Sequence, residues 1–343
     1  MKSFDEIFVD KTKYGVKVQT TEYGEVGEHI IIDQGQSQIA GYTDRQEGLF
    51  EEVPVVIFGD HTRVIKYVDE PFFLGADGVK VLRSKDDNAN YKYLYYALKN
   101  ARIPDTGYNR HFKWLKEVQI NYPDSDKQAE IVDILDNVSS VIKKREDELC
   151  VLDDLIKARF VEMFGDPVSN SYGLPEATLP ELGEFGRGIS KHRPRNDPKL
   201  LGGGYPLIQT GDVANAGLYI TSYNSTYSEL GLRQSKMWKK GTLCITIAAN
   251  IAKTAILTFD ACFPDSVVGF TANEKTNNIF IHYWFLFFQT ILESQAPESA
   301  QKNINLKILS ELRVIVPKKE KQDEFVDFIH QVDKSKVVVA SVK

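Results

Sequence analysis

Basic side chains gather in two short stretches of the sequence, where they could bind phosphate groups. Each stretch contains a single acidic residue, Asp197 in the first and Asp105 in the second. Such local clusters can hold phosphates even though the whole chain carries a formal charge of −6. A solvated loop is the alternative interpretation of each cluster. The basic residues are Arg187, Lys191, Arg193, Arg195 and Lys199, and Lys99, Arg102, Arg110, Lys113 and Lys116.

Loop residues in and near these clusters are the candidates for reading the bases of duplex DNA. Arg can form paired hydrogen bonds with guanine, and Asn or Gln with adenine, whereas Lys mostly anchors phosphate. Surface solvation is the alternative for each residue. Asn109 and Asn303 recur in both copies of the repeat described below, which suits a shared scaffold role better. The candidates are Asn109, Arg110, His111 and Lys113, and Lys191, His192, Arg193, Arg195, Gln301, Lys302 and Asn303.

Motifs that would give the chain its own catalytic activity are missing from the sequence. It contains no NPPY- or DPPY-type tetrapeptide, no GxGxxG after a strand and no GxxxxGK[ST] loop. The six histidines are scattered without metal-ligand spacing. Pro123, Asp124, Asp126 and Lys127 superficially resemble a nuclease motif, but their spacing is wrong and they open a helix, so capping is favoured. We therefore expect no catalytic residue, no metal site and no cofactor in this chain.

The composition is that of a soluble protein with room for two domains. The chain has 343 residues, of which 42% are hydrophobic and 26% charged. No run of 18 apolar residues occurs, and the first residues do not resemble a signal peptide. The three cysteines form no CxxC pair. These features predict a reduced, cytoplasmic protein without a membrane partner.

An internal repeat organises the chain. Residues 108–135 align without gaps onto residues 302–329, with ten of 28 positions identical. In both copies an alternating strand ends at a proline, and a Gln-x-Glu sequence then opens a helix. Weaker similarities join 30–44 to 205–221, 75–82 to 263–270 and 91–98 to 280–288. The repeat predicts two copies of one α+β unit.

The stretch from Ser125 to Phe164 is predicted to be one long helix, because apolar residues recur at heptad spacing without Gly or Pro. So narrow an apolar stripe needs a partner helix. We expect an antiparallel coiled coil with the helix of the second copy, although pairing with another protein is the alternative. The predicted seam contains Ile131, Leu135, Val138, Ile142, Leu149, Leu152 and Ile156, and Phe325, Ile329 and Val332.

These elements predict four segments along the chain. Two strand-rich domains occupy residues 1–124 and 166–317, and two spacer helices occupy residues 125–165 and 318–343.

In its repeat, its long helix and two stretches of the second domain, the chain resembles the specificity subunit of a Type I restriction-modification system. The resemblance lies in the repeated Pro-x4-Gln block, the helix ending in Phe164–Gly165–Asp166–Pro167, and the stretches 205–213 and 263–270. It implies two target-recognition domains that each read half of a bipartite double-stranded DNA site. It also implies spacer helices that fix the gap and dock two methyltransferase subunits, together with restriction subunits.

The resemblance further implies that DNA methylation uses S-adenosylmethionine, and cleavage ATP and Mg, all held by partner subunits. The second spacer helix, 318–343, is much shorter than the first. Its distal end is therefore expected to be missing, disordered or supplied by another chain. A coiled-coil adaptor that does not read DNA, and a stand-alone methyltransferase or nuclease, remain the alternative hypotheses.

Overall fold

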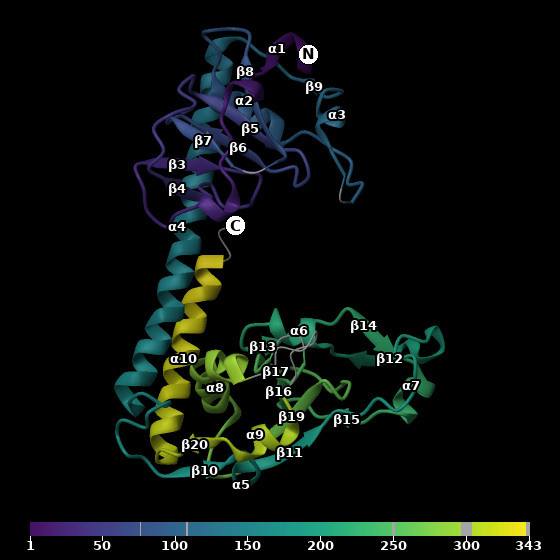
Figure 1. The fold of residues 1–343 in the computed structure, drawn as a ribbon. Helices are drawn as coiled ribbons and strands as arrows, with labels where there is room; N and C mark the ends of the chain where they lie inside the picture. The colour runs from purple at the N-terminus through teal and green to yellow at the C-terminus, as the bar shows by residue number, and fades with distance from the viewer. Residues whose placement is uncertain (76, 108, 249–250, 296–303, 341–343) are drawn as a thin grey trace. The chain divides into compact units, whose positions relative to one another are not determined.

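The structure, a computed structural model, describes residues 1–75, 77–107, 109–248, 251–295 and 304–340. The chain forms two compact units, Met1–Lys144 and Arg145–Lys343, and the boundary falls inside one long helix. Both units combine helices with mainly antiparallel sheets, so the predicted α+β class is confirmed (Figure 1).

Unit 1 is built on two sheets. The order of the larger sheet is β2-β8-β5-β6, with every pairing antiparallel. Strand β5 is buried along its whole length, because its apolar run Val-Val-Ile-Phe lies between other elements on both faces. In the smaller sheet β3 pairs antiparallel with β4 and parallel with β7. The strands are β2 (Phe8–Asp10), β3 (His29–Ile32), β4 (Gly41–Thr43), β5 (Val55–Gly59), β6 (Ile65–Val68), β7 (Phe72–Leu74) and β8 (Val79–Ser84).

Short elements at both ends of this unit close it. Strand β1 (Lys2–Ser3) pairs with β9 (Gln119–Ile120), and a capping box joins Ser3 to Glu6 at the start of the following helix. Helix α2 is capped by Asn90, whose side chain accepts a hydrogen bond from the backbone N–H of Tyr93 at 3.0 Å. The helices are α1 (Phe4–Ile7), α2 (Tyr91–Lys99) and α3 (Phe112–Leu115), with 3-10 turns at Thr12–Tyr14 and Thr20–Glu22.

Within the described residues, unit 2 repeats this plan with one additional strand in each of its two sheets. Its larger sheet has the order β11-β19-β16-β17-β13 and its smaller sheet the order β14-β12-β18-β15. The larger sheet includes β11 (Gly183–Arg187), β13 (Tyr219–Ile220), β16 (Leu243–Thr246), β17 (Thr254–Leu257) and β19 (Val267–Ala272). The smaller includes β12 (Leu201–Leu207), β14 (Ser225–Tyr227), β15 (Met237–Trp238) and β18 (Ala261–Cys262). The helices are α5 (Leu179–Leu182), α6 (Thr210–Ala214), α7 (Glu229–Arg233), α8 (Asn278–Gln295) and α9 (Leu306–Glu311), with a 3-10 turn at Pro198–Leu200.

The repeat seen in the sequence is visible in the pairing of the strands. Strand β20 (Arg313–Ile315) pairs with β10 (Glu176–Thr178), as β9 pairs with β1, and Thr178 forms a capping box with Glu181. One similarity extends less far than its sequence suggests. In unit 1 the second strand of 30–44 is β4, which pairs with β3, whereas in unit 2 the second strand of 205–221 is β13, which joins the other sheet. In unit 2 it is β14 that pairs antiparallel with β12, in the way that β4 pairs with β3 in unit 1.

Helix α4 (Ser125–Phe164) is continuous, and within unit 2 its second part packs against α10 (Lys319–Ala340). Arg159 lies 3.5 Å from Glu324, and Asp153 forms an ion pair with Lys336. Higher residue numbers on α4 therefore lie beside lower residue numbers on α10, so the two helices are antiparallel. Phe160 packs edge-on against Phe325, with ring centroids 5.3 Å apart.

The predicted seam residues differ in burial. Ile156, Phe325, Ile329 and Val332 are buried in the core of unit 2, and Leu152 packs against that core. Leu149 is half-buried. In unit 1, Ile131 packs beside the core and Leu135 is half-buried. Val138 and Ile142 are exposed by 50% and 41%, contrary to their predicted place in a seam. Heptad spacing shows which face of the helix is apolar, but only a packed partner buries it.

Candidate nucleic-acid interface

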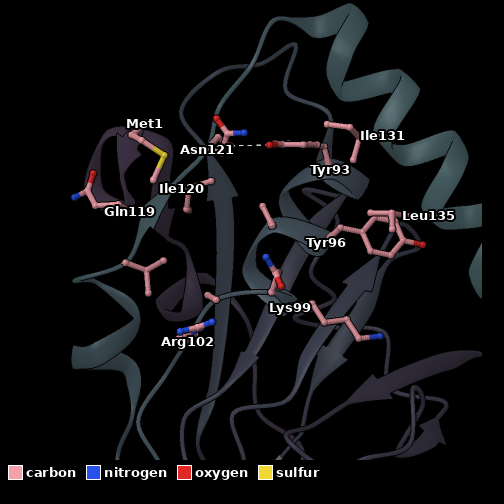
Figure 2. A pocket seen from close by; sticks show the side chains of 14 residues that line it. Met1, Tyr93, Tyr96, Lys99, Arg102, Gln119, Ile120, Asn121, Ile131 and Leu135 are labelled. Atoms are coloured by element: carbon pink, nitrogen blue, oxygen red, sulfur yellow. Dashed lines mark hydrogen bonds between the residues drawn. The ribbon is translucent and has the colours of Figure 1, made fainter.

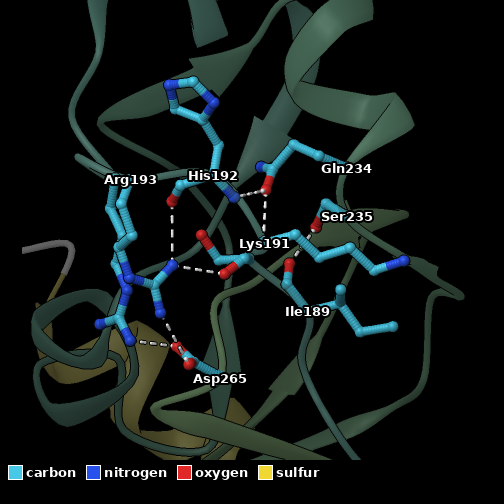
Figure 3. Close-up of polar contacts among 9 residues, drawn as sticks. Ile189, Lys191, His192, Arg193, Gln234, Ser235 and Asp265 are labelled. Atoms are coloured by element: carbon cyan, nitrogen blue, oxygen red, sulfur yellow. Dashed lines mark hydrogen bonds and ion pairs between the residues drawn. The ribbon is translucent and has the colours of Figure 1, made fainter.

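The basic cluster of unit 2 lies on the loop that joins β11 to β12. Gln234, directly after α7, anchors this loop, because its Oε1 accepts hydrogen bonds from the backbone N–H groups of Lys191 at 2.6 Å and His192 at 3.0 Å (Figure 3). The Ser235 hydroxyl donates to the carbonyl of Ile189 at 2.8 Å. The side chains of Lys191 and His192 are exposed, whereas the backbone beneath them is fixed.

Two arginines of this loop share one carboxylate. Asp265 lies between β18 and β19 and accepts from Arg193 at 3.3 Å through Oδ2, while Arg195 pairs with its Oδ1. Arg193 also donates to the carbonyls of Ser190 at 2.6 Å and His192 at 2.9 Å (Figure 3). About half of each arginine side chain is exposed. Both guanidinium groups are therefore held in place while retaining N–H groups that can donate to an incoming acceptor.

The remaining polar residues of the loop stabilise its end. Asp197 accepts from the backbone N–H of Lys199 at 3.0 Å, and its other oxygen lies 3.1 Å from Nε2 of His192. The Lys199 N–H, and then His192, lower the pKa of the Asp197 carboxyl. The His192 side chain is thus exposed to solvent and also contacts Asp197. Arg187, at the end of β11, and Lys199 are exposed.

The cluster of unit 1 contains one residue that the sequence prediction placed wrongly at the surface. His111 is only 1% exposed. Its backbone N–H donates to the carbonyl of Asp60 at 2.8 Å, its Nδ1 lies 3.1 Å from the same oxygen, and its Nε2 lies 3.3 Å from the Thr106 hydroxyl. Asp60 also accepts from the N–H of Phe112 at 2.7 Å. His111 therefore fastens its loop to the end of β5, and its side chain is enclosed by the protein.

The other candidates of unit 1 are exposed, but they do not all point away from the protein. The Asn109 side chain donates to the Thr106 carbonyl and so closes its own turn. Lys113 lies over the Trp114 ring, with Nζ 4.9 Å from the centroid. Arg110 is exposed, as are Lys99, Arg102 and Lys116. Arg110 is thus the unit 1 candidate most similar to the arginines of unit 2.

The single acid of this cluster also has a partner that the sequence did not reveal. Arg63, after β5, donates to Asp105 at 2.7 Å and to the Ile103 carbonyl at 3.4 Å. A backbone N–H from Gly107, followed by Arg63, lowers the pKa of Asp105. Gln301, Lys302 and Asn303 lie outside the described residues.

Three residues that the sequence analysis missed therefore shape the two clusters. Asp265, Gln234 and Arg63 are separated by at least forty residues in the chain from the groups they hold. Helical or strand periodicity does not report contacts of this kind. Asp265 lies within the 263–270 stretch that repeats 75–82, and this repeat is the one sequence signal that drew attention to it.

The described residues form neither a metal-ligand cluster nor a membrane-spanning helix. Among them, no group of three His, Cys, Asp or Glu side chains could hold a metal ion. Burial raises the pKa of the Cys244 thiol far above its usual range. Within the same residues, no helix is both long and apolar enough to cross a membrane.

The chain matches a known family twice. Residues 9–150 and 176–338 match the Type I restriction modification DNA specificity domain, one match for each copy of the repeat. The chain is 30% identical over 151 residues to the specificity subunit of the EcoR124I/EcoR124II type I restriction enzyme of Escherichia coli. That alignment spans 40% of this chain and 37% of the relative.

Two more distant similarities cover nearly the whole chain. It is 20% identical over 319 residues to a putative MjaX specificity subunit of Methanocaldococcus jannaschii, which spans 89% of this chain and 70% of that protein. The crystal structure of a Type I restriction-modification S subunit from M. genitalium aligns with 99% of this chain and 90% of its own length. Its TM-score is 0.56 and its identity 16%, so it supports the fold. The chain therefore belongs to the Type I restriction modification DNA specificity domain family, a family of non-catalytic recognition subunits.

Proposed function

We propose that this chain recognises a bipartite double-stranded DNA sequence, with unit 1 reading one half and unit 2 the other. The observation that carries the proposal is the anchored loop of unit 2. Gln234 and Ser235 fix its backbone, and Arg193 and Arg195 lie half-exposed on it. Arginines that are already oriented lose less side-chain entropy when they bind, and their forked N–H groups suit guanine or phosphate.

Asp265 is part of this proposal, because its carboxylate stands where a phosphate or a base acceptor would be expected to compete for the two arginines. In the free protein it pairs with both guanidinium groups and partly neutralises their charge. Non-specific attraction to DNA is thereby reduced. A correctly placed set of acceptors would then be needed to replace the carboxylate, which favours specific over non-specific binding.

We infer that the DNA-bound chain directs two methyltransferase subunits and the restriction subunits to its target in the cytoplasm. S-adenosylmethionine, ATP and Mg would be held by those partners. The spacer between the half-sites would depend on α4, whose 40 residues span about 60 Å at ~1.5 Å per residue. The similarity to restriction-enzyme specificity subunits supports these assignments.

Methylome sequencing of cells that carry the complete system tests the proposal. Arg193→Ala together with Arg195→Ala should relax or abolish one half of the methylated motif, and each lost bidentate base contact should weaken discrimination by about 1–3 kcal/mol. Arg233→Ala is the matched control, because Arg233 is an exposed arginine on neighbouring α7 whose ion pair, within the described part of the chain, is with Glu229 on the same helix. It should leave the motif unchanged.

Exchange of residues 170–315 for the same region of a relative with another specificity extends the test. One half of the motif should change, while the other half and the gap are retained. A simultaneous change of both halves would contradict one reading unit per half-site. Unchanged methylation after the double arginine substitution would show that the loop is not part of the DNA interface. If none of the variants lost DNA binding, an adaptor without DNA readout would be favoured.

A further inference from the structure

In each unit one loop leaves the first strand of the larger sheet and leads to the smaller sheet. In unit 2 this is the β11–β12 loop, which carries Arg193 and Arg195. In unit 1 it is the stretch between β2 and β3, because β2 pairs antiparallel with β8 as β11 does with β19. That stretch begins with Lys-Thr-Lys-Tyr-Gly-Val-Lys, which contains three lysines and no acidic residue. These residues 11–17, the lysine loop, therefore occupy in unit 1 the place of the arginine-bearing loop of unit 2.

The backbone of the lysine loop is anchored at both ends. Near its start the Thr12 hydroxyl accepts a hydrogen bond from the N–H of Val81 in β8 at 3.0 Å. Just after its end the N–H of Val18 donates to the carbonyl of Leu74 in β7 at 2.8 Å. The Lys17 side chain, directly before this second anchor, is exposed. The loop thus presents a cation from a fixed backbone, as the anchored loop of unit 2 presents its arginines.

An aspartate stands at the same position of the repeat in both units. The aligned stretches 75–82 and 263–270 place Asp77 opposite Asp265. Asp265 pairs with Arg193 and Arg195, and Asp77 pairs with Lys17. In each unit, one carboxylate therefore holds a cation of the loop that leaves the larger sheet. The chemistry of the cation differs, because unit 2 uses arginines and unit 1 a lysine.

A second cation of unit 1 acts on the same carboxylate. Lys17, and more weakly Arg110 and His61, lower the pKa of the Asp77 carboxyl. Gln34 holds the segments of Asp77 and His61 together, because its amide donates to the Asp77 carbonyl at 2.9 Å and its Oε1 accepts from the His61 N–H at 3.1 Å. The side chains of Lys17 and Asp77 are 43% and 84% exposed. An anion from solution can therefore reach this pair.

The first members of the basic cluster predicted for unit 1 lie in different surroundings. Lys99 and Arg102 both line a hollow of about 690 Å³ between α2, β9 and the beginning of α4 (Figure 2). Ile120 and Leu135 contribute apolar surface to its walls, and no residue of the lysine loop borders it. Apolar walls offer a phosphate no hydrogen-bond donor. The lysine loop is therefore better suited to contact a DNA backbone than the rim of this hollow.

We propose that the lysine loop is a DNA-contacting loop of unit 1, in which Lys17 binds a backbone phosphate that replaces the Asp77 carboxylate. This inference rests on the proposed function and adds to it a site in unit 1. A lysine ammonium is a point charge without the planar fork of arginine, so Lys17 anchors a phosphate and carries no sequence information. The two equivalent loops thus differ in task, since Arg193 and Arg195 of unit 2 have the geometry to read bases.

The salt dependence of DNA binding by the chain assembled with its methyltransferase subunits tests this site. The probe is a duplex that carries the motif found by methylome sequencing of the wild type. Lys17→Ala should weaken binding about fivefold at ~0.1 M salt and reduce the slope of log K against log salt by about 0.9. The methylated motif should stay unchanged, because a phosphate contact does not distinguish bases.

Lys92→Ala is the matched control, because Lys92 also pairs with an aspartate, Asp136, and its side chain is 45% exposed. It removes the same charge from unit 1 and should change the affinity less than about twofold. Equal losses for Lys17→Ala and Lys92→Ala would overturn the proposal, and so would an unchanged salt slope for Lys17→Ala. A relaxed half of the motif after Lys17→Ala would also overturn it, because Lys17 would then contact a base.

Asp77→Asn tests the role of the carboxylate. It releases Lys17, so binding to a duplex without the motif should strengthen about threefold, and adding Lys17→Ala should remove this gain. A gain that persists in the double variant would contradict the pairing of Lys17 with phosphate. Each of these failures leaves the proposed function intact as long as the wild-type complex prefers its motif. Absence of that preference would instead contradict the proposed function, and the site in unit 1 with it.

Discussion

The same sequence block opens a helix in each unit, yet only unit 2 buries the face of that helix completely. On α10, Phe325, Ile329 and Val332 are buried under the end of α4. Their counterparts Ile131, Leu135 and Val138 on α4 are half-buried or exposed. The two helices share their pattern, so the pattern does not decide how much of the face is covered. What decides it is whether the unit contains a third helix to lie on it.

The glutamine of the Pro-x4-Gln block shows the same difference and allows the largest effect to be measured. Gln322 is fully buried, accepts from the Thr276 hydroxyl at 2.9 Å and donates to the carbonyls of Lys275 and Pro317 at 3.0 and 2.9 Å. Gln128 donates to the Pro123 carbonyl at 2.8 Å and lies beside Tyr122.

Gln322→Ala should therefore lower the free energy of unfolding of unit 2 by about 4 kcal/mol, because it leaves two buried polar groups and one partly buried carbonyl without their partner. Gln128→Ala should lower that of unit 1 by about 1 kcal/mol. Hydrogen exchange of β16 and β5 reports the two units separately in one protein. Equal losses in the two units would show that the extra bonds of Gln322 add nothing.

A buried histidine gives unit 2 a dependence on pH. His282 on α8 lies 2.9 Å from the Thr254 hydroxyl, and burial lowers its pKa to about 4, with a smaller contribution from Lys336. The unfolded chain binds this proton at about pH 6.5. Stability is therefore complete above pH 6.5 and is lost as the pH falls towards 4, by about 3 kcal/mol in all. Asn277 and Asn90 cap α8 and α2 in the same way, by accepting from the N–H groups of Phe280 and Tyr93. Counted from these caps, α2 carries Tyr95 where α8 carries His282.

Urea unfolding between pH 7 and pH 4.5 measures this loss. In a Trp114→Phe background the two remaining tryptophans, Trp238 and Trp284, both report on unit 2. His282→Gln keeps a polar partner for Thr254 and cannot gain a proton, so its unfolding free energy should fall much less over this range. Parallel curves for the two proteins would exclude His282 as the cause.

How much of this could be read from the sequence depends on the range of the interactions. The helix from Ser125 to Phe164 was predictable to the residue, because apolar spacing and the flanking Pro and Gly act locally. The repeated strand, proline and helix were predictable for the same reason. The burial of His111 was not, since it depends on Asp60 from another part of unit 1. Nor was the pairing of Arg193 and Arg195 with Asp265, which folding brings to the loop from β18–β19.

The smallest effect comes from a pair of valines that the repeat aligns with each other. Val332 on α10 and Val138 on α4 differ tenfold in exposure, at 5% and 50%. Val332→Ala removes two buried methyl groups and should lower the free energy of unfolding of unit 2 by about 2 kcal/mol. Val138→Ala removes exposed methyl groups and places a better helix former in α4, so unit 1 should change by less than about 0.5 kcal/mol.

Hydrogen exchange of β16 and β5 again reports the two units separately. A loss of stability in unit 1 as large as that in unit 2 would mean that Val138 is already covered, and the contrast between the two helices would have to be abandoned.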